Sequence, residues 1–169
     1  MDTAEIIEGI EGSLDAEEVA VSRARAETKY IVFSAGAGLY ALQAEDIQEI
    51  MLNMDIHYLP FVPPFVRGLI NRLGEPLTVL DLVNLLYGQD INGKAFIILK
   101  PHISKMAFLI DVVRDIAWVA PESIRRVTAG SQAQGAYVEG MFARKEEDVT
   151  ILSLTEIIQA VKKAFDAES

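Results

Sequence analysis

The chain has 169 residues, 51% of them hydrophobic and 24% charged, which is enough for one globular domain or two small lobes that share a core. The formal net charge of −10 argues against nucleic-acid binding, because contacts to a phosphate backbone need clustered lysines and arginines. The absence of cysteine excludes disulfides, cysteine-ligated zinc, iron–sulfur clusters and thiol catalysis.

Residues 1–28 form an acidic extension. Ile6, Ile7, Ile10 and Leu14 recur in it at helical spacing, which allows a short amphipathic helix, although two glycines weaken it. Its acidic start is unlike the basic start of a signal peptide. The apolar runs of the chain are too short to cross a bilayer, so a cytoplasmic protein is expected. The simpler interpretation of the extension is a solvated segment that packs on another surface.

A β-hairpin is predicted where the apolar pattern changes to a period of two. Its first strand begins at Lys29, its turn lies at residues 36–38, and its second strand covers residues 39–44. The pattern of residues 45–53 does not decide between an extended segment and a helical turn.

The stretch from residue 59 to residue 88 organises the rest of the chain. Its three prolines exclude a regular helix or a central strand at its start. A tight turn is predicted between Gly68 and Gly74, followed by a buried strand that ends at Asp81 and a helical segment that ends at Gly88. A stiff apolar loop that leads into a core strand is typical of a docking surface.

The second half of the chain predicts further short strands and one helix. The expected strands cover residues 95–100, 106–110, 112–119, 137–143 and 149–154, and residues 128–135 form a polar loop. The last segment, TEIIQAVKKAF, predicts an amphipathic helix capped by Thr155 or Ser153. Roughly eight or nine short strands joined by hairpins favour barrels or sandwiches over a parallel sheet.

Few residues suggest catalysis. His57 and His102 lie in or near predicted loops, where a histidine is usually a surface residue. Asp81 and Asp111 each end an apolar run, as catalytic carboxylates often do, but an aspartate after a strand more commonly caps the next turn. Phosphate-binding glycine loops and serine-nucleophile motifs are absent, so no metal or cofactor is expected. Trp118 is interpreted as a core or partly exposed sheet residue, with a binding role as the alternative.

Glu49 is unusual because it lies in the otherwise apolar segment IQEIM. A half-buried carboxylate needs a cation, and Arg67 and Arg72 are the candidates. A plain surface glutamate is the alternative interpretation.

The motifs YIVFSAG, LYAL, IQEI, YLPFVPPFVRGLIN, GEPLTVLDL, FLIDVV, AWVAPESIR and YVEGMF follow one another over residues 29–164. In order and spacing they resemble the CheW family of chemotaxis coupling proteins. The resemblance implies a mostly β fold of two intertwined five-stranded SH3-like β-barrels with a C-terminal helix. It places this CheW-like domain at residues 29–169, after the extension at 1–28, which is longer than the resemblance requires.

The resemblance implies a non-enzymatic adaptor that couples chemoreceptors to the histidine kinase CheA. Its expected partners are the regulatory domain of CheA and the cytoplasmic tip of a chemoreceptor, without nucleic acid and without membrane insertion. The alternatives are an adaptor of a pilus-linked or other chemosensory system, or a fragment of a CheV-like protein, although no segment resembles a receiver domain. A rival from another class is a small β-barrel hydrolase that uses Asp81 and Asp111. These two carboxylates should lie far apart or bind backbone groups if the adaptor interpretation holds.

The family's motifs also imply a groove for the receptor or the kinase. Its expected residues are Glu49, Ile50, Pro60, Pro63, Phe65, Val66, Gly68, Asn71, Arg72 and Leu73. Where the family has Asn-Leu-Arg-Gly, this chain has Asn71-Arg72-Leu73-Gly74, so the arginine that would pair with Glu49 is replaced by leucine. We therefore expect Arg72 not to reach Glu49 unless the register shifts, with Arg67 or a local rearrangement as the substitute, and an altered groove.

Overall fold

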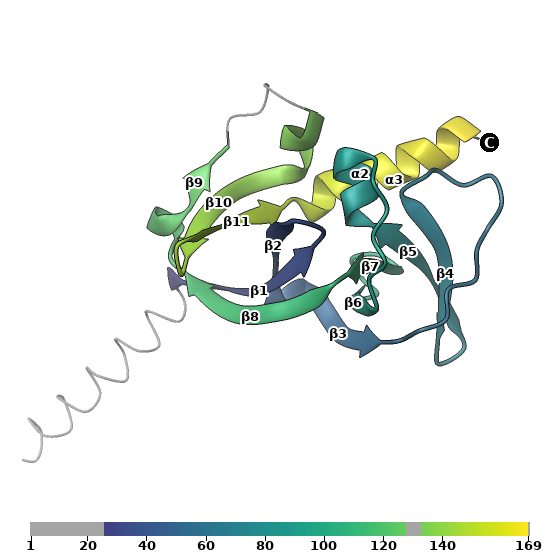
Figure 1. Ribbon diagram of the computed structural model, residues 1–169, viewed down its shortest axis with the longest axis horizontal. Coiled ribbons are helices and arrows are strands. Elements are labelled where there is room, and N and C mark those ends of the chain that lie inside the picture. Colours follow the sequence, from purple (N-terminus) through teal and green to yellow (C-terminus); the bar gives the residue numbers. More distant parts are fainter. Residues whose placement is uncertain (1–25, 128–132, 169) are drawn as a thin grey trace, which may run out of the picture.

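The computed structural model describes residues 26–127 and 133–168, and it is mostly β (Figure 1). The six-stranded sheet and its core are the first lobe, and the five-stranded sheet and its core are the second lobe. In spatial order, the first lobe has β8 (Val112–Val119), β1 (Thr28–Ala35), β2 (Gly38–Gln43), β11 (Glu147–Leu152), β10 (Val138–Arg144) and β9 (Arg125–Arg126). The second lobe has β3 (Ile47–Leu52), β6 (Ala95–Leu99), β7 (Met106–Ile110), β5 (Glu75–Asp81) and β4 (Val66–Arg72).

The two lobes are intertwined along the chain. The first hairpin, β1–β2, belongs to the first lobe, the next five strands build the second lobe, and β8 to β11 return to the first. The return is completed where β11 pairs with β2 in parallel. Residues 45–53, left undecided by the sequence, are mainly strand β3, preceded by a 3₁₀ turn at Ala44–Asp46. Two further short 3₁₀ segments lie at Pro121–Ser123 and Ala133–Tyr137.

The described residues form eleven strands, two more than the upper expectation, and the additions are β4 and β9. The predicted tight turn between Gly68 and Gly74 is wrong, because this segment is strand β4, and only Leu73 and Gly74 turn. Gly68 is required for another reason. Its φ is +140°, and a Cβ there would lie 2.3 Å from the backbone oxygen of His57. The glycine therefore permits a close approach of two backbones within a sheet.

Local signals predicted the segment after β4 correctly. Strand β5 ends at Asp81, whose side chain accepts a hydrogen bond from the backbone N–H of Asn84 and caps helix α2 (Leu82–Tyr87). Gly88 ends the helix in the left-handed conformation at φ +73°, and its N–H donates to the carbonyl of Asn84. The strand, cap, helix and glycine stop thus follow directly from residue types.

Helix α3 (Leu154–Glu168) packs against the second lobe after the chain has left β11 (Figure 1). The backbone N–H of Glu156 donates to the hydroxyl of Ser153 at 3.4 Å, so Ser153 and not Thr155 caps the helix. Ile157 is fully buried in the main core, as the helical spacing predicted.

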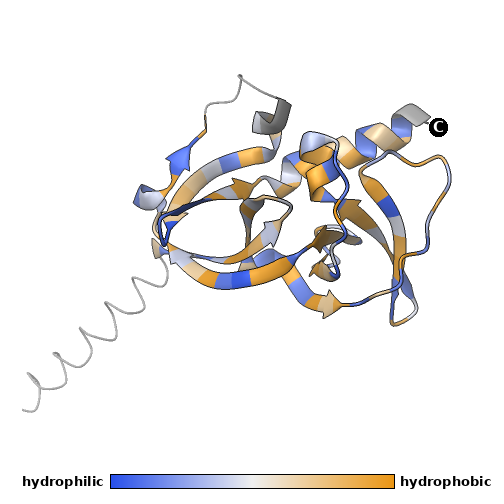
Figure 2. Cartoon of the chain, in the orientation of Figure 1, coloured by the Kyte–Doolittle hydropathy of each residue, from blue (hydrophilic) through white to orange (hydrophobic). Residues whose placement is uncertain are grey.

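One strand connects the two cores. Along β1, Tyr30 and Val32 pack into a small cluster inside the first lobe, whereas Phe33 and Ala35 pack into the main cluster. The main cluster also contains Phe108 and most buried side chains of the second lobe. Figure 2 shows hydrophobic residues concentrated along the strands of both lobes. Because β1 buries both of its faces, the lobes are joined through a shared core and not by a flexible linker.

The predicted loop at residues 128–135 falls largely outside the described residues, and so does almost all of the acidic extension. Among the described residues, no helix is both long enough and apolar enough to span a membrane.

Candidate functional site

Glu49 and Arg72 bring the two edges of the second lobe together. Strands β3 and β4 stand at opposite ends of the five-stranded order, yet Nε of Arg72 donates to Oε1 of Glu49. The backbone of His57, in the segment that follows β3, pairs with that of Leu69 in β4 through two hydrogen bonds of 2.7 and 2.9 Å. These contacts close the sheet on itself, as in an SH3-like barrel, and cover edges that would otherwise be free.

The expectation that Arg72 does not reach Glu49 is therefore wrong. Val66 and Ile70 are buried along β4, and the period of two places Arg72 on their side of the strand. Leu73, where the family pattern has arginine, lies in the turn at φ +52° and is 93% exposed. The exchange thus moves the arginine from the turn to the strand end, where it still pairs with the carboxylate.

Ile50, Leu52 and Leu73 are exposed apolar residues close along the chain to the two members of this ion pair, and together with Glu49 and Arg72 they are termed the closure edge. Ile50 and Leu52 are exposed because exposed and partly buried side chains alternate along β3. Leu73 and Gly74 form a two-residue hairpin turn in which both have positive φ. Such a turn favours Asn-Gly, and leucine in it costs about 1 kcal/mol. The closure edge therefore presents apolar side chains to solvent, one of them in a strained conformation.

The structure does not gather all of the predicted groove residues into one exposed site. Pro63, Val66 and Gly68 are buried, and Phe65 packs partly buried against the main core. Ile50, Pro60, Asn71 and Leu73 are exposed, and Glu49 and Arg72 form the ion pair.

Sequence reasoning missed Phe61 in the proline-rich loop before β4. This side chain is 95% exposed, and its φ is +58°. Like Leu73, it combines a bulky apolar side chain with a left-handed backbone, which is uncommon without a functional reason. Its position between prolines in LPFVPP was the available signal.

The first lobe carries a second exposed apolar surface along β8, which stands at one end of its sheet. We term it the β8 strip and define it by Val112, Ile116 and Trp118. All three side chains are exposed, Trp118 by 52%, and the ammonium of Lys29 lies 5.8 Å from the centroid of its ring. Only Trp118 was considered from the sequence, as a lesser alternative. The alternation in VVRDIAWV could have indicated the other two.

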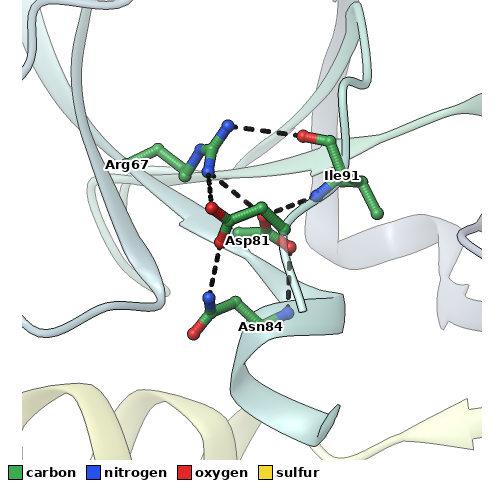
Figure 3. A network of polar contacts seen from close by, with 5 residues as sticks. Arg67, Asp81, Asn84 and Ile91 are labelled. Atoms are coloured by element: carbon green, nitrogen blue, oxygen red, sulfur yellow. Dashed lines mark hydrogen bonds and ion pairs between the residues drawn. The ribbon is translucent and has the colours of Figure 1, made fainter. Parts of the chain in front are cut away.

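Asp81 is fully buried, and its carboxylate is occupied by structural contacts (Figure 3). It accepts hydrogen bonds from the backbone N–H groups of Asn84 at 3.0 Å and Ile91 at 3.2 Å. Arg67, expected as a substitute partner of Glu49, lies 3.9 Å from Asp81 and 3.1 Å from Asp90 instead. Burial raises the pKa of the Asp81 carboxyl, while the two N–H donors and Arg67 oppose that shift. The predicted cap is confirmed.

Asp111 also serves a turn. Its carboxylate accepts a hydrogen bond of 2.8 Å from the backbone N–H of Gly36, between β1 and β2. The two candidate catalytic carboxylates thus bind backbone groups in different lobes, which removes the basis of the hydrolase alternative. The part of the chain that the structure describes holds no group of three His, Cys, Asp or Glu that could bind a metal ion. A two-lobed, mostly β scaffold with exposed apolar side chains on both lobes is the class of protein that these features define.

The comparisons with known proteins give the family. A family model for the CheW-like domain matches residues 29–162, so the chain belongs to the CheW-like family. Over 141 residues it is 23% identical to the chemotaxis protein CheW of Treponema pallidum (strain Nichols), covering 77% of this chain and 81% of that protein. The crystal structure of the scaffolding protein TtCheW from Thermoanaerobacter tengcongensis matches with a TM-score of 0.67 at 26% identity, covering 75% of this chain and 89% of that one.

These findings confirm the resemblance and the mostly β, SH3-like fold that it implied. They also identify the chain as a non-enzymatic adaptor of chemotaxis signalling and do not favour the hydrolase.

Proposed function

We propose that the chain acts in the cytoplasm as a link between the tip of a chemoreceptor and the regulatory domain of the histidine kinase CheA. The observation that carries this proposal is the presence of an exposed apolar surface on each lobe, the closure edge and the β8 strip. An adaptor that holds two partners at once needs two separate surfaces. Exposed apolar side chains gathered in this way are more typical of interaction sites than of inert surface.

The closure edge suits the kinase domain. In the family the regulatory domain has the same type of barrel, so it can present a similar apolar surface. Ile50 and Leu73 would be its apolar contacts, and the Glu49–Arg72 pair would fix their positions. A contact limited to one barrel edge is small, so we expect a transient interface of about 1,200 Å² and modest affinity.

The β8 strip suits the receptor tip. In the family the tip lies between the two barrels, and the strip begins at Val112, two residues after β7 ends and the chain leaves the second lobe. A helical tip could lay an apolar stripe along Ile116 and Trp118. The buried members of the predicted groove, such as Val66, would then support the fold and not contact the partner.

Two single substitutions test this assignment in the full chain. Leu73→Asp adds a charge at the closure edge, and Ile116→Asp adds the same charge at the β8 strip. By titration calorimetry, we expect Leu73→Asp to weaken binding of the CheA regulatory domain at least about tenfold while the receptor tip binds as before. Ile116→Asp should do the reverse. Wild-type protein that binds neither partner would contradict the proposed function, and equal effects of both variants on both partners would contradict the division of surfaces.

A further inference from the structure

The segment from β4 to α2 in the second lobe is similar to the segment from β10 to α3 in the first lobe. Residues 66–82 and 138–154 align without a gap, at an offset of 72 positions. The identical pairs are Val66 and Val138, Gly68 and Gly140, Arg72 and Arg144, Glu75 and Glu147, Thr78 and Thr150, Leu80 and Leu152, and Leu82 and Leu154. Each segment forms a strand, a two-residue turn, a second strand and the first residue of a helix. The chain therefore contains an internal repeat.

The hydrogen bonds of the two segments correspond as well. The N–H of Asp81 donates to the carbonyl of Phe65 at 2.7 Å. At the offset of 72, the N–H of Ser153 donates to the carbonyl of Tyr137 at 2.8 Å. The strand order β3–β6–β7–β5–β4 of the second lobe recurs in the first lobe as β8–β1–β2–β11–β10, to which β9 is added. The lobes are thus two copies of one five-stranded barrel, and β8 is the counterpart of β3.

The ladders show which residues of β3 and β8 are equivalent. From edge to edge, one row of paired residues is Glu49, Ile98, Ala107, Val79 and Gly68 in the second lobe, and the matching row is Asp115, Val32, Ala41, Ile151 and Gly140 in the first lobe. The last two members of each row correspond at the offset of 72. The first members correspond in turn, so Asp115 is the counterpart of Glu49.

The first lobe closes by the same kind of contact as the second. Nε of Arg144, at the end of β10, donates to Oδ2 of Asp115 on β8 at 2.6 Å, and its Nη2 pairs with the same carboxylate. Strands β8 and β10 stand at opposite ends of the five equivalent strands, as β3 and β4 do in the second lobe. Arg144 therefore has the place of Arg72, and its carboxylate partner has the place of Glu49.

The guanidinium of Arg144 contacts two successive residues of β8. In addition to the carboxylate of Asp115, it reaches the backbone carbonyl of Ile116, to which Nη2 donates at 3.5 Å. Ile116 and Trp118 follow the carboxylate by one and three positions, so the alternation of a strand turns both to the same face, where both are exposed. A planar guanidinium that holds a carboxylate and the next carbonyl together limits the movement of the strand that carries these side chains.

We propose that Arg144 is a positioning residue for the β8 strip, as Arg72 is for the closure edge. It holds Asp115 and the carbonyl of Ile116 so that Ile116 and Trp118 keep one arrangement before any partner binds. That this arrangement promotes binding of the receptor tip rests on the proposed function, whereas the effect of Arg144 on β8 does not.

Hydrogen–deuterium exchange of the full chain tests the effect on β8 without a partner. Arg144→Gln removes the guanidinium, and Arg72→Gln is the same change in the second lobe. We expect Arg144→Gln to raise the exchange rates of the β8 amides that pair with β1 at least about fivefold, and those of β3 less than about twofold. Arg72→Gln should do the reverse. Arg125→Gln is the control in the first lobe, because Arg125 pairs with Asp148 at the surface, and it should change neither strand.

Unchanged exchange in β8 of Arg144→Gln would overturn the proposal. Equal acceleration in both lobes would also overturn it, because Arg144 would then stabilise the whole fold and position no particular strand. Arg144→Lys keeps the charge but not the planar fork, so exchange in β8 should remain faster than in wild type. Exchange as slow as in wild type would show that a charge alone is enough, which would contradict the proposed bridge.

Calorimetric titration of the receptor tip supplies the second readout. We expect Arg144→Gln to weaken tip binding about fivefold or more and Arg125→Gln to leave it within about twofold of wild type. If the wild-type protein binds the tip and Arg144→Gln binds it equally well, Arg144 does not position the strip for this partner. If the wild-type protein does not bind the tip, the proposed function fails, while the exchange measurement still decides the effect of Arg144 on β8.

Discussion

Two of the carboxylates that arginines approach in the second lobe, Asp81 and Glu49, differ in burial and role. Asp81 is fully buried and binds two backbone N–H groups, with Arg67 beside it. Glu49 is partly exposed and, within the part of the chain that the structure describes, pairs only with Arg72, at the edge where the barrel closes. The buried carboxylate organises helix α2 and the segment at Ile91, while the exposed pair holds a surface in place. The Asp81 carboxylate therefore stabilises the fold, whereas the Glu49 carboxylate holds an exposed surface in place.

Removal of the buried carboxylate should give the largest effect. Asp81→Ala uncaps α2, leaves the N–H of Ile91 without its acceptor and removes a partner of Arg67. We expect a loss of about 3 kcal/mol in the free energy of unfolding, measured by urea denaturation. Asp111→Ala is the matched control, because this carboxylate accepts one N–H in an exposed turn, and it should cost about 1 kcal/mol. Equal losses would show that the buried contacts of Asp81 have no special weight.

Reversing the order of Arg72 and Leu73 should lower stability by a smaller amount, because it breaks the partly exposed Glu49–Arg72 ion pair. The double variant Arg72→Leu with Leu73→Arg moves the arginine into the exposed turn, away from Glu49. We expect a stability loss of about 0.5–1 kcal/mol, as for a partly exposed ion pair. Glu49→Ala should then destabilise the wild-type chain but not the exchanged one, which a double-mutant cycle measures. A gain in stability on exchange would mean that position 73 is the better place for the arginine.

Relief of strain at the closure edge should separate stability from binding. Leu73→Asn places a residue that tolerates positive φ at the first position of the hairpin turn. We expect a gain of up to about 1 kcal/mol in thermal or urea unfolding, together with weaker binding of the CheA regulatory domain. Ala143→Asn, on the exposed side of β10, is a control that should not change binding. A variant that binds as tightly as wild type would remove Leu73 from the proposed contact.

The pH dependence of stability should have opposite signs at two aspartates. The hydrogen bond from Arg144 is the main cause of a lowered pKa at Asp115, below the usual 3.8. Its stabilising contribution is therefore present above pH 3.8 and is lost as the pH falls through the lower folded value. Burial raises the pKa of Asp81, so its protonation favours the folded state, and that contribution is lost as the pH rises from 3.8 through the raised value.

Unfolding measured from about pH 2 to 6 checks this difference. Asp115→Asn should reduce the loss of stability at the acid end, and Asp81→Asn should remove the component of opposite slope. Unchanged profiles would contradict both assignments. This is the smallest expected effect, because Asp115 is at the surface.

Features that depend on neighbouring residues could be predicted from the sequence, and features that depend on closure of the sheet could not. The order of strand, Asp81 cap, α2 and Gly88 is encoded within a short segment. Gly68 was misread as a turn residue because its constraint comes from the backbone of His57, eleven positions earlier. Arg72 was wrongly predicted not to reach Glu49, because Glu49 lies on the strand at the opposite edge of the sheet. Residue types alone do not determine which edge strands of a sheet meet when it closes.

The same limit explains why only some of the predicted site residues are exposed. Glu49 was named because it is a carboxylate in an apolar segment and because it matches a family motif, whereas Leu73 was named because it departs from one. Val66 and Gly68 match family motifs, yet they are buried, since such motifs mix residues that fold the loop with residues that face outward. Trp118 could be named from its type, but its exposure depends on how β8 sits at the end of its sheet.

Simultaneous binding tests most directly whether one chain binds two partners through separate surfaces. Calorimetric titration of the receptor tip would be repeated with wild-type protein that is saturated with the CheA regulatory domain. We predict that the tip binds with affinity within about twofold of its value for the free chain, and that all three components elute together in size-exclusion chromatography. Loss of tip binding in the presence of the kinase domain would mean that both partners share one surface, and it would contradict the proposed division of surfaces.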